Sequence, residues 1–407
     1  MLGESWPVVV AIFLLAGVLY GQKVLFIMGI ILLLLQLLIT FWSRWVLWRL
    51  EYTRKLSENR AFVGEKVELT VRISNPKPLP VTWLEVREQI DEELTVEQGT
   101  VLPSPMPRIK YIAENTSLGW YEAVTWHYYI RCTRRGYYKV GPASIRSGDL
   151  FGLFQRRLEL GKADYLIVYP KTVPLRELGL TERRPFGDSR TRQRLFEDPI
   201  RITGLREYRN DDPFKRIDWK ASARRQELQV KVYEATSSLY LQVILNIDTF
   251  EHPWQGHDPV VLERGIMVAA SVARHAWEHK LSVGVAANGS VPGSDKPLNV
   301  RPGGSPEQLL RVLEALALVS PFATSSIDAI IKEEGQRLPW GSTIVVISAI
   351  ATESIWAEIG RLKDAGHSVY FLYSGFGNTP RPIVGVPVYN VGQYLQTEDV
   401  AREQGIT

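Results

Sequence analysis

The first 42 residues constrain this chain more than any other stretch, because they are almost uninterrupted hydrocarbon from Trp6 to Trp42. Amide or charged side chains interrupt the run only at Gly21-Gln22-Lys23 and at Gln36. About 20 apolar residues span a bilayer, a length that residues 24–42 reach and residues 6–20 approach. We predict a transmembrane helical hairpin, with spans at about 6–20 and 24–42 joined by a tight turn.

The residues that follow the apolar run combine positive charge with tryptophan. Arg44, Arg49, Arg54, Lys55 and Arg60 are interleaved with Trp42, Trp45 and Trp48. Lys and Arg mark the cytoplasmic side of a membrane, and tryptophan is enriched at the membrane interface. The first ten residues contain Glu4 but neither Lys nor Arg, unlike the basic start of a cleaved signal peptide. We expect a protein of the cell membrane with cytoplasmic soluble domains; the competing interpretation is one long, tilted or broken helix that exports the rest.

Length and composition indicate several folded domains. A chain of 407 residues with 45% apolar content is too long for one ordinary core and too apolar for general disorder. The net charge of +4 is too weak to indicate nucleic acid as a partner. The single cysteine, Cys132, forms no internal disulfide, which is typical of a reducing compartment. We divide the chain into a membrane hairpin at 1–50, a β-sandwich domain at 56–170, a charged junction at 171–237, an α/β domain at 238–395 and a C-terminal tail at 396–407.

Residues 61–165 have the pattern of an all-β domain. Glu65 to Ile73 alternates apolar and polar side chains, as a half-buried strand does. Residues 81–90 and 120–132 also read as strands, and Asn75-Pro76-Lys77-Pro78 has turn chemistry. Short strands with such punctuation predict a β-sandwich, which we interpret as a scaffold or contact domain.

Beyond Tyr240, apolar strands alternate with amphipathic helices. Strands are predicted in residues 241–248, 281–287, 343–348 and 369–373, and helices in 260–280, 306–319, 325–337 and 353–365. Ser305 and Thr352 are plausible helix caps. This alternation predicts an open, mostly parallel sheet with helices on both faces, which binds ligands at the carboxyl ends of its strands.

The first of these strands ends at Asp248, a placement that resembles the von Willebrand factor A fold. In that family an Asp-x-Ser-x-Ser loop, with a Thr and an Asp from later loops, holds a divalent cation. Here Phe250 and His252 occupy the serine positions, and Ser348-Ala349-Ile350 supplies no later aspartate. Asp248 and Thr324 are therefore only weak metal-ligand candidates, and we predict no cofactor. Asp248 is otherwise a loop cap or a salt-bridge partner.

His275-Ala276-Trp277-Glu278-His279 matches H-x-x-E-H, an inverted zinc-protease pattern. On a helix the two histidines would share a face, and Glu278 could act as general base. The pattern is short and lacks an independent signal for a third ligand. The helix also turns its apolar face to the sheet, so we place the histidines near solvent. A zinc hydrolase is the enzymatic alternative to our prediction that the chain is not an enzyme.

The junction mixes charges of both signs. Residues 183–225 contain eleven arginines, interleaved with seven carboxylates. A nucleic-acid surface would have cations in excess, so nucleic acid is disfavoured. We predict a network of Arg206, Arg209 and Arg216 with Asp211, Asp212 and Asp218, in which Trp219 beside Ile217 anchors the segment on a neighbouring sheet. A partner-docking surface is the alternative. Catalysis by the paired acids Asp211 and Asp212 is the third possibility, disfavoured because the nearby arginines would keep both carboxyl groups ionised.

The same segment resembles a known family. Gly204-Leu-Arg-Glu-Tyr208, Asp211-Asp212, Arg216-Ile-Asp-Trp-Lys220 and Ser222-Ala-Arg224 are similar to the signature of bacterial and archaeal proteins classified as domain of unknown function 58. Similarity extends to residues 228–234, to Arg135-Gly-Tyr-Tyr-Lys-Val-Gly-Pro142 and to Asp149-Leu-Phe-Gly-Leu-Phe154. The resemblance implies a von Willebrand factor A-like domain and association with MoxR-type AAA+ ATPases, and it implies no established enzymatic activity.

We therefore expect a membrane-anchored, non-enzymatic adaptor or scaffold. The resemblance implies a MoxR-like ATPase partner and an unknown protein client at the cytoplasmic membrane face. The residues expected to contact the partner or a neighbouring domain are those of the signature: Arg206, Tyr208, Asp211, Asp212, Arg216, Asp218, Trp219, Lys220 and Arg224. The alternative is a divalent-cation-dependent ligand-binding protein that uses the degenerate metal-ion adhesion loop at Asp248.

Overall fold

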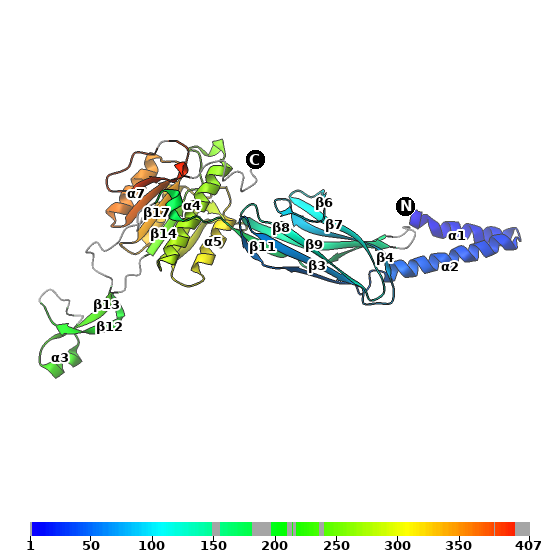
Figure 1. Cartoon of the computed structure of the whole chain (residues 1–407), viewed down its shortest axis with the longest axis horizontal. Helices are drawn as coiled ribbons and strands as arrows, with labels where there is room; N and C mark the ends of the chain where they lie inside the picture. Colours follow the sequence, from blue (N-terminus) through cyan, green and yellow to red (C-terminus); the bar gives the residue numbers. More distant parts are fainter. Residues whose placement is uncertain are drawn as a thin grey trace. The chain divides into compact units, whose positions relative to one another are not determined.

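The computed structural model describes residues 2–148, 155–180, 197–209, 214, 217–235, 240–377 and 379–394. The chain divides into two compact units, one formed largely by residues up to Lys171 and the other largely by residues from Thr172 onward. Figure 1 shows helices and β-strands in the first unit and an α/β arrangement in the second. The prediction of a multidomain chain with all-β and α/β parts is confirmed at this level.

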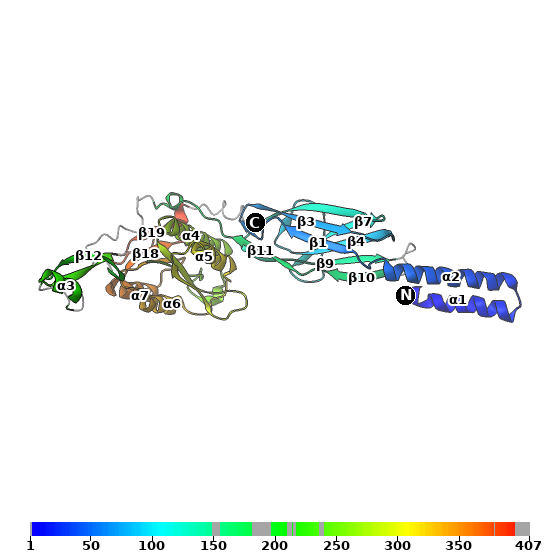
Figure 2. The ribbon, with the colours of Figure 1, turned by 90° about the horizontal axis from the view of Figure 1, so that it is seen from below.

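Two helices, α1 (Leu2–Leu19) and α2 (Lys23–Trp45), open the first unit. They lie side by side in both views of the ribbon (Figures 1 and 2). Glycines permit the close approach, because a Cβ on Gly17 would lie 2.6 Å from the backbone nitrogen of Phe26. A Cβ on Gly29 would lie equally close to Leu14. Within the described residues, one helical segment, Lys23–Trp42, is long and apolar enough to cross a membrane, and the apolar part of α1, Pro7–Leu19, is shorter.

Eleven strands follow in the described part of the first unit. They are β1 (Glu51–Leu56), β2 (Arg60–Phe62), β3 (Lys66–Ser74), β4 (Val81–Asp91), β5 (Thr95–Val96), β6 (Thr100–Pro103), β7 (Ile109–Leu118), β8 (Ala123–Arg131), β9 (Gly136–Gly148), β10 (Gln155–Leu160) and β11 (Asp164–Tyr169). One sheet has the order β1-β3-β8-β5, and the other has the order β2-β11-β9-β4-β7-β6, with β10 paired to β9. Apolar side chains of both sheets form a common core, as Leu69, Ile90 and Leu166 illustrate. The strands predicted at 65–73, 81–90 and 120–132 correspond to β3, β4 and β8.

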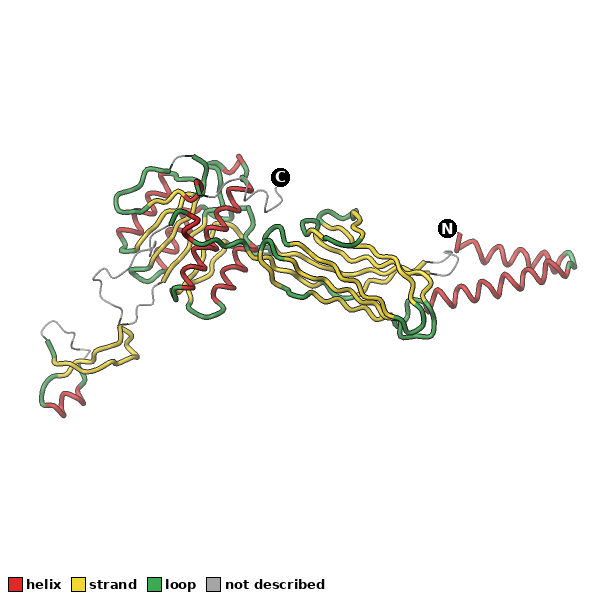
Figure 3. Tube along the Cα trace, viewed as in Figure 1, coloured by secondary structure: helices red, strands yellow, loops and turns green. Residues whose placement is uncertain are grey.

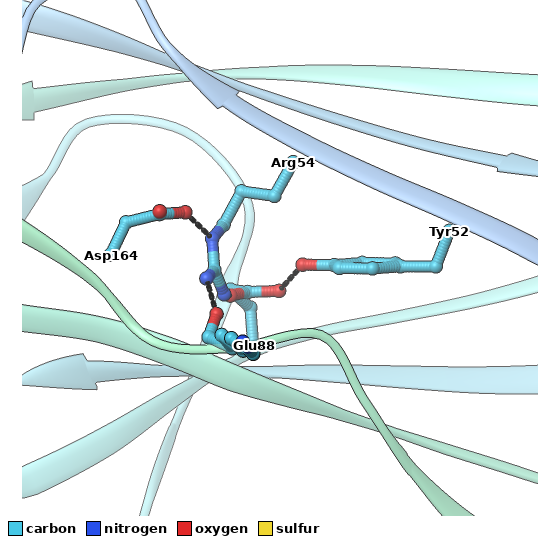
Figure 4. Close-up of polar contacts among 5 residues, drawn as sticks. Tyr52, Arg54, Glu88 and Asp164 are labelled. Carbon is cyan, nitrogen blue, oxygen red and sulfur yellow. Dashed lines mark hydrogen bonds and ion pairs between the residues drawn. The ribbon is translucent and has the colours of Figure 1, made fainter.

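A polar cluster joins the two sheets across this core (Figure 4). The Arg54 guanidinium on β1 pairs with the Glu88 carboxylate on β4, and both side chains are almost completely buried. The Tyr52 hydroxyl donates to Glu88 at 2.5 Å, and Arg54 Nε donates to Asp164 at 2.8 Å. The guanidinium occupies the space that a Cβ on Gly141 would fill, and Gly141 has φ +92°. The glycine at this position is therefore required both by the backbone angle and by the arginine.

The second unit begins with a short 3-10 helix, η1 (Leu175–Leu178), and with a two-stranded sheet of β12 (Glu197–Glu207) and β13 (Gln229–Ala235). A seven-residue helix, α3 (Trp219–Arg225), lies between these strands in the chain. The two strands are antiparallel, with Arg206 opposite Val230. The family signature recognised in the sequence, residues 204–224, therefore spans the end of β12 and most of α3.

The remainder of the unit is a six-stranded sheet with helices on both faces (Figure 3). Its strands are β14 (Tyr240–Leu245), β15 (Ser282–Ser290), β16 (Pro297–Gly303), β17 (Thr343–Ser348), β18 (Ser368–Tyr373) and β19 (Val388–Asn390). Its helices are α4 (Pro259–Glu278), α5 (Gln308–Leu318), α6 (Ile327–Arg337) and α7 (Glu353–Asp364), with short 3-10 helices η3 (Pro253–Gln255) and η4 (Val391–Gln393). The order is β16-β15-β14-β17-β18-β19, and only the edge strand β16 is antiparallel to its neighbour.

Alternating residues of the central strand face different helices. Gly265 of α4 lies against Leu245, whereas Ile244 packs into a core with residues of α6 and α7. The predicted cap Thr352 is confirmed, because its hydroxyl accepts from the backbone N–H of Ile355. The predicted cap Ser305 is wrong, because α5 begins after Glu307 without a side-chain cap. Its first residue, Gln308, is instead buried and donates to the carbonyl oxygens of Val283 and Arg301, which fixes the start of the helix.

Candidate functional site

The carboxyl edge of the six-stranded sheet is the first candidate site. Strands β15 and β17 lie on opposite sides of β14, so the order in which the chain adds strands reverses there. Open α/β sheets bind ligands at such a reversal, outside the carboxyl ends of the strands. Four strands end in polar residues at this edge: β14 leads to Asn246 and Asp248, β15 contains Asn288, β17 ends at Ser348 and β18 is followed by Ser374.

Asn288 organises this edge. Its Oδ1 accepts from the backbone N–H of Ile247 at 2.8 Å, and its Nδ2 donates to Asp248 Oδ2 at 2.7 Å. The neighbouring Asn246 donates to Ser348 Oγ at 3.0 Å, which links β14 to β17. These bonds satisfy buried polar groups where the sheet has no further ladder partner, and they fix the loop that begins at Asp248.

The two metal-ligand candidates from the sequence both contact Asn288. Thr324 donates to its carbonyl oxygen through the backbone N–H at 2.9 Å and through the hydroxyl at 3.4 Å. Burial raises the pKa of the half-buried Asp248 carboxyl, and the hydrogen bond from Asn288 partly offsets this shift. Thus one Asp248 oxygen accepts an amide hydrogen bond, and the Thr324 hydroxyl is directed to the backbone. Within the described ranges no group of three or more His, Cys, Asp and Glu side chains is arranged to hold a metal ion.

A hollow of about 470 Å³ lies beside this network. Its walls come from three loops that leave the carboxyl ends of β14, β17 and β18, and from the start of α4. Phe250 and His252, the residues at the expected serine positions, line it. The other lining residues are Thr249, Glu251, Gln255, Asp258, Val261, Ala349, Ile350, Tyr373, Gly375 and Phe376. The loop therefore presents an aromatic wall where a metal-binding loop would present hydroxyl groups.

Arg264 of α4 supports one side of the hollow and was missed in the sequence analysis. This arginine is completely buried, and its guanidinium donates to the carbonyl oxygen of Ser374 at 3.2 Å. The same guanidinium lies 4.8 Å from the ring centroid of Phe376, which is a cation–π contact. Burial lowers the pKa of Arg264, while the nearby Asp258 carboxylate acts in the opposite direction. An arginine on the apolar stripe of a predicted core helix is the sequence signal that would have identified it.

The H-x-x-E-H pattern lies at the end of α4. The rings of His275 and His279 are 4.0 Å apart, and His279 Nδ1 lies 2.8 Å from the carbonyl oxygen of His275. Glu278 pairs with Arg274 at 2.9 Å, and both side chains of that pair are about half exposed. Burial and the neighbouring His279 lower the pKa of His275. The two histidines do share a face near the helix end, as expected, while Glu278 is engaged by an arginine.

The signature segment is held together by Asp218 and Ser222. Asp218 caps α3, because its carboxylate accepts from the backbone N–H groups of Lys220 and Ala221 at 3.1 and 3.0 Å. Ser222 Oγ donates to the Asp218 carbonyl oxygen and accepts from the backbone N–H of Gln229, both at 2.8 Å. Lys231 on β13 lies 3.8 Å from the Asp218 carboxylate. Helix α3 is thereby attached to the start of β13.

The predicted arginine network is described only in part, because Asp211, Asp212 and Arg216 lie outside the described residues. Arg206 donates to the carbonyl oxygen of Glu207 at 3.1 Å. The rings of Tyr208 and Phe214 are 5.8 Å apart. Ile217 is buried, but its neighbour Trp219, which we expected to anchor the segment, is 66% exposed. Lys220 and Arg224 are also exposed.

Comparison with known proteins matches residues 204–371 to a family model described as "Protein of unknown function DUF58". Uncharacterized protein YeaD of Bacillus subtilis (strain 168) is 23% identical over 313 residues, which cover 76% of this chain and 73% of that protein. Among solved structures, a CARDB domain from Pyrococcus furiosus has a TM-score of 0.21 and 18% identity, covering 29% of this chain and 91% of that one. A cohesin module from Clostridium perfringens has the same TM-score at 14% identity, covering 29% of this chain and 96% of that one.

Proposed function

Since residues 204–371 belong to the family described as protein of unknown function DUF58, and since their signature presents an exposed aromatic surface, we propose a membrane-anchored adaptor. In this proposal the chain is not an enzyme. It holds a partner, a MoxR-type AAA+ ATPase according to the family resemblance, next to a protein client at the cytoplasmic face of the cell membrane. The alternative that the sequence left open, cation-dependent ligand binding at Asp248, gains no support from a carboxylate that accepts an amide hydrogen bond.

The membrane anchor is supported by the apolar surface of α1 and α2. Large apolar side chains are more than half exposed on both helices, among them Ile12, Leu15, Leu34 and Leu37. A helix of a water-soluble protein buries its apolar stripe against the protein core, whereas in a membrane lipid tails solvate such a stripe. Arg49 stacks on Trp48 directly after α2, 4.6 Å from the ring centroid. In the proposed topology both helices form a transmembrane hairpin, and this basic aromatic end marks the cytoplasmic side.

Protease accessibility tests that topology. Protease added to spheroplasts should leave the soluble domains intact, and cleavage should follow only after the membrane is permeabilised. Digestion of the β-rich domain in sealed spheroplasts would place it outside and exclude the cytoplasmic adaptor. A cytoplasmic protein and a periplasmic protein of the same cells serve as controls for sealing and for digestion.

The α/β domain supports a non-catalytic, von Willebrand factor A-like role. Numbered from β14, its strands have the order 3-2-1-4-5-6, and the third strand is the antiparallel edge. This is the order of doubly wound sheets that bind ligands at the reversal beside the first strand. At that point the chain carries amide and hydroxyl groups that bond to one another, such as Asn246 with Ser348. Such an edge is suited to rigid presentation of loops to another protein.

The observation that carries the proposal is the surface of the signature segment. Among the described apolar side chains of this segment and of the adjoining residues 228–230, Ile217 and Val230 are buried, while Phe214 and Trp219 are 71% and 66% exposed. Leu205 and Leu228 are also exposed. A two-stranded sheet whose described side chains form so small a core is marginally stable in water, so these aromatic groups fit a surface that another protein covers. Exposed Lys220 and Arg224 give this surface positive charge and favour an acidic partner.

Co-purification tests the proposal with the full chain in detergent micelles or nanodiscs and the MoxR-type ATPase of the same genome. The wild-type chain should retain the ATPase, and Trp219→Ala should reduce its recovery about tenfold or more, as loss of a tryptophan hot spot does. Trp254→Ala removes a still more exposed tryptophan of the α/β domain, 80% exposed, and should leave recovery unchanged. Equal recovery with wild type and Trp219→Ala would remove the support for docking through the signature.

A further inference from the structure

The hollow at the carboxyl edge of the six-stranded sheet combines aromatic walls with negative charge. From this combination we propose that it binds an arginine or lysine side chain carried by an extended segment of a partner protein. The site is separate from the Trp219 surface and does not depend on the ATPase partnership. If the adaptor proposal holds, this hollow is the side that recognises the client.

The walls suit the stem and the head of a basic side chain. Phe250, Tyr373 and Phe376 supply aromatic groups, and Val261 and Ile350 supply aliphatic ones. Arginine and lysine bury their methylene stems on apolar surface, and their charged heads are attracted to the faces of aromatic rings. The ring of Phe376 already contacts one guanidinium, that of buried Arg264. Phe250 and Tyr373 are therefore the rings available to a second cation.

The charge of the hollow favours a cation. Two carboxylates line it, Glu251 and Asp258, and its lining contains neither lysine nor arginine. The buried Arg264 behind Phe376 interacts with Asp258, which leaves the Glu251 carboxylate as the charge of the lining that faces an incoming group. Asp258 accepts from the backbone N–H groups of Val260 and Val261 at the start of α4, at 2.9 and 3.2 Å. Glu251 is exposed and, within the described ranges, has no ion-pair partner. Glu251 is thus the group that can pair with an incoming guanidinium or ammonium.

The size and the rim of the hollow indicate a protein segment as the occupant. A volume of about 470 Å³ exceeds what one basic side chain fills and accommodates its neighbours in an extended strand. A large aromatic side chain next to the hollow is exposed, with Trp254 80% accessible. Trp254 stacks on His252 with ring centroids 4.2 Å apart. An exposed tryptophan beside such a pocket is typical of protein–protein contact surfaces.

Contacts within the domain hold the loops around the hollow in place before any segment binds. Thr249 Oγ1 accepts from the backbone N–H of Asp258 at 2.7 Å, which closes the loop that carries Phe250 and Glu251. The Tyr373 hydroxyl donates to the carbonyl oxygen of Phe376 at 3.0 Å, and Arg264 holds the carbonyl of Ser374 from inside. A preformed loop pair of this kind reduces the entropy lost when a segment binds.

Fluorescence anisotropy with a labelled peptide tests the proposal on the full chain in detergent micelles. The probe is acetyl-Gly-Leu-Arg-Leu-Gly-amide, and the comparison peptides carry citrulline or glutamate in place of arginine. Citrulline keeps the shape of arginine but has no charge. We expect the arginine peptide to bind about tenfold more tightly than the citrulline peptide and the glutamate peptide to bind more weakly than both.

Variants locate the binding. Glu251→Gln should lower the affinity for the arginine peptide toward that for citrulline, without changing citrulline binding. The control variant Glu333→Gln alters a half-exposed glutamate near the end of α6, the helix that leads to the amino end of β17. It should not change the affinity for either peptide. Because Glu251 is exposed, its variant should unfold at the wild-type temperature. Trp219→Ala should also bind the peptide normally, so failure of ATPase docking and failure of this site are distinguishable.

Three outcomes would overturn the inference. They are equal affinity for the arginine and citrulline peptides, unchanged affinity in Glu251→Gln, and binding of acetyl-arginine-amide as tight as that of the peptide. The last result would assign the hollow to a small cationic molecule instead of a protein segment.

Discussion

The Lys77 ammonium group donates to the carbonyl oxygen of Val46 at 2.8 Å, so the loop between β3 and β4 caps the end of α2. Lys77 is 5% exposed, and Val46 packs with Ile73 and Val81 in a core that joins the helix to the β-rich domain. A cation at the C-terminal end of a helix interacts favourably with its unpaired carbonyl groups. The helix proposed to span the membrane is therefore attached rigidly to the first soluble domain.

This buried lysine should make stability depend on pH in the alkaline range. Burial lowers the pKa of Lys77 to about 8, whereas the unfolded chain has the usual value near 10.5. Below pH 8 the group is charged in both states, and folding must bury that charge. As the pH rises from 8 to 10.5, the folded form releases its proton first, so the free energy of unfolding should increase by up to about 3 kcal/mol.

The measurement is the difference in unfolding free energy between wild type and Lys77→Met across this pH range, in detergent micelles. Other lysines and tyrosines titrate in both proteins and cancel in the difference. Lys66→Met, which alters a largely exposed lysine paired with Glu97, should retain the wild-type slope. An identical slope in wild type and Lys77→Met would contradict the prediction.

Breaking the polar cluster of Tyr52, Arg54 and Glu88 should destabilise the β-rich domain strongly. Arg54→Met leaves the buried Glu88 carboxylate without its cation, which costs about 3–5 kcal/mol in comparable sites. Tyr52→Phe removes one hydrogen bond of 2.5 Å and should cost about 1–2 kcal/mol, because the acceptor is charged. Chemical denaturation measures both changes.

The double variant Arg54→Met with Glu88→Gln separates the cost of the unpaired charge from the cost of the lost packing. A neutral amide no longer requires the guanidinium, so this variant should be more stable than Arg54→Met alone. Equal stability of the single and double variants would show that the lost arginine acts through packing and not through the unpaired charge.

The sequence predicted local structure better than it predicted contacts. Apolar runs and alternation located β3, β4, α4 and α7 within a few residues, because burial on one face imposes a period on the sequence. The cap Thr352 was also found, since capping depends on residues three positions apart. Ser305 also carries a hydroxyl group, but α5 begins at Gln308. The buried Gln308 side chain donates to two carbonyl groups from other elements and fixes that start.

The sequence predicted where the candidate site lies but not which residues contact one another there. Asp248 was found because it follows an apolar strand, and the carboxyl edge of the sheet is where it lies. Its partner Asn288 is 40 residues away, and sequence spacing carries no information on that pairing. Asp218, which we expected in the arginine network, also caps its own helix through Oδ1, because backbone amides two and three residues on lie within reach of a short side chain.

Removing the charge of Asp248 should stabilise the α/β domain near neutral pH. Burial raises the pKa of this carboxyl above its usual value, so the folded state binds the proton more tightly than the unfolded state. The stability from this group is present at low pH and is lost as the pH rises through the raised pKa. Asp248→Asn keeps an acceptor for Asn288 and should gain stability relative to wild type as the pH increases from 4 to 7.

Thermal unfolding of wild type and Asp248→Asn at several pH values checks this sign. Asn288→Ala removes both the donor to Asp248 and the acceptor of the Ile247 N–H, and should destabilise the domain by about 1–3 kcal/mol. A wild-type protein that becomes more stable than Asp248→Asn toward pH 7 would indicate that the carboxylate is needed, as a bound cation would require.

Two glycine substitutions of identical chemistry should have opposite effects, because their surroundings differ. A Cβ on Gly375 would lie 2.6 Å from the Tyr373 hydroxyl and closer still to the carbonyl oxygen of Ala349, a backbone atom that cannot turn aside. Gly375→Ala should therefore cost about 1–3 kcal/mol and distort the hollow that Tyr373 and Ala349 line.

A Cβ on Gly360, inside helix α7, meets no atom within 4 Å. Gly360→Ala should stabilise the chain by about 0.5–1 kcal/mol and leave binding of the arginine peptide unchanged, because alanine loses less backbone entropy than glycine in a helix. Denaturation and peptide anisotropy on both variants test the pair, and normal peptide affinity in Gly375→Ala would show that the loop after β18 is not a wall of the binding site.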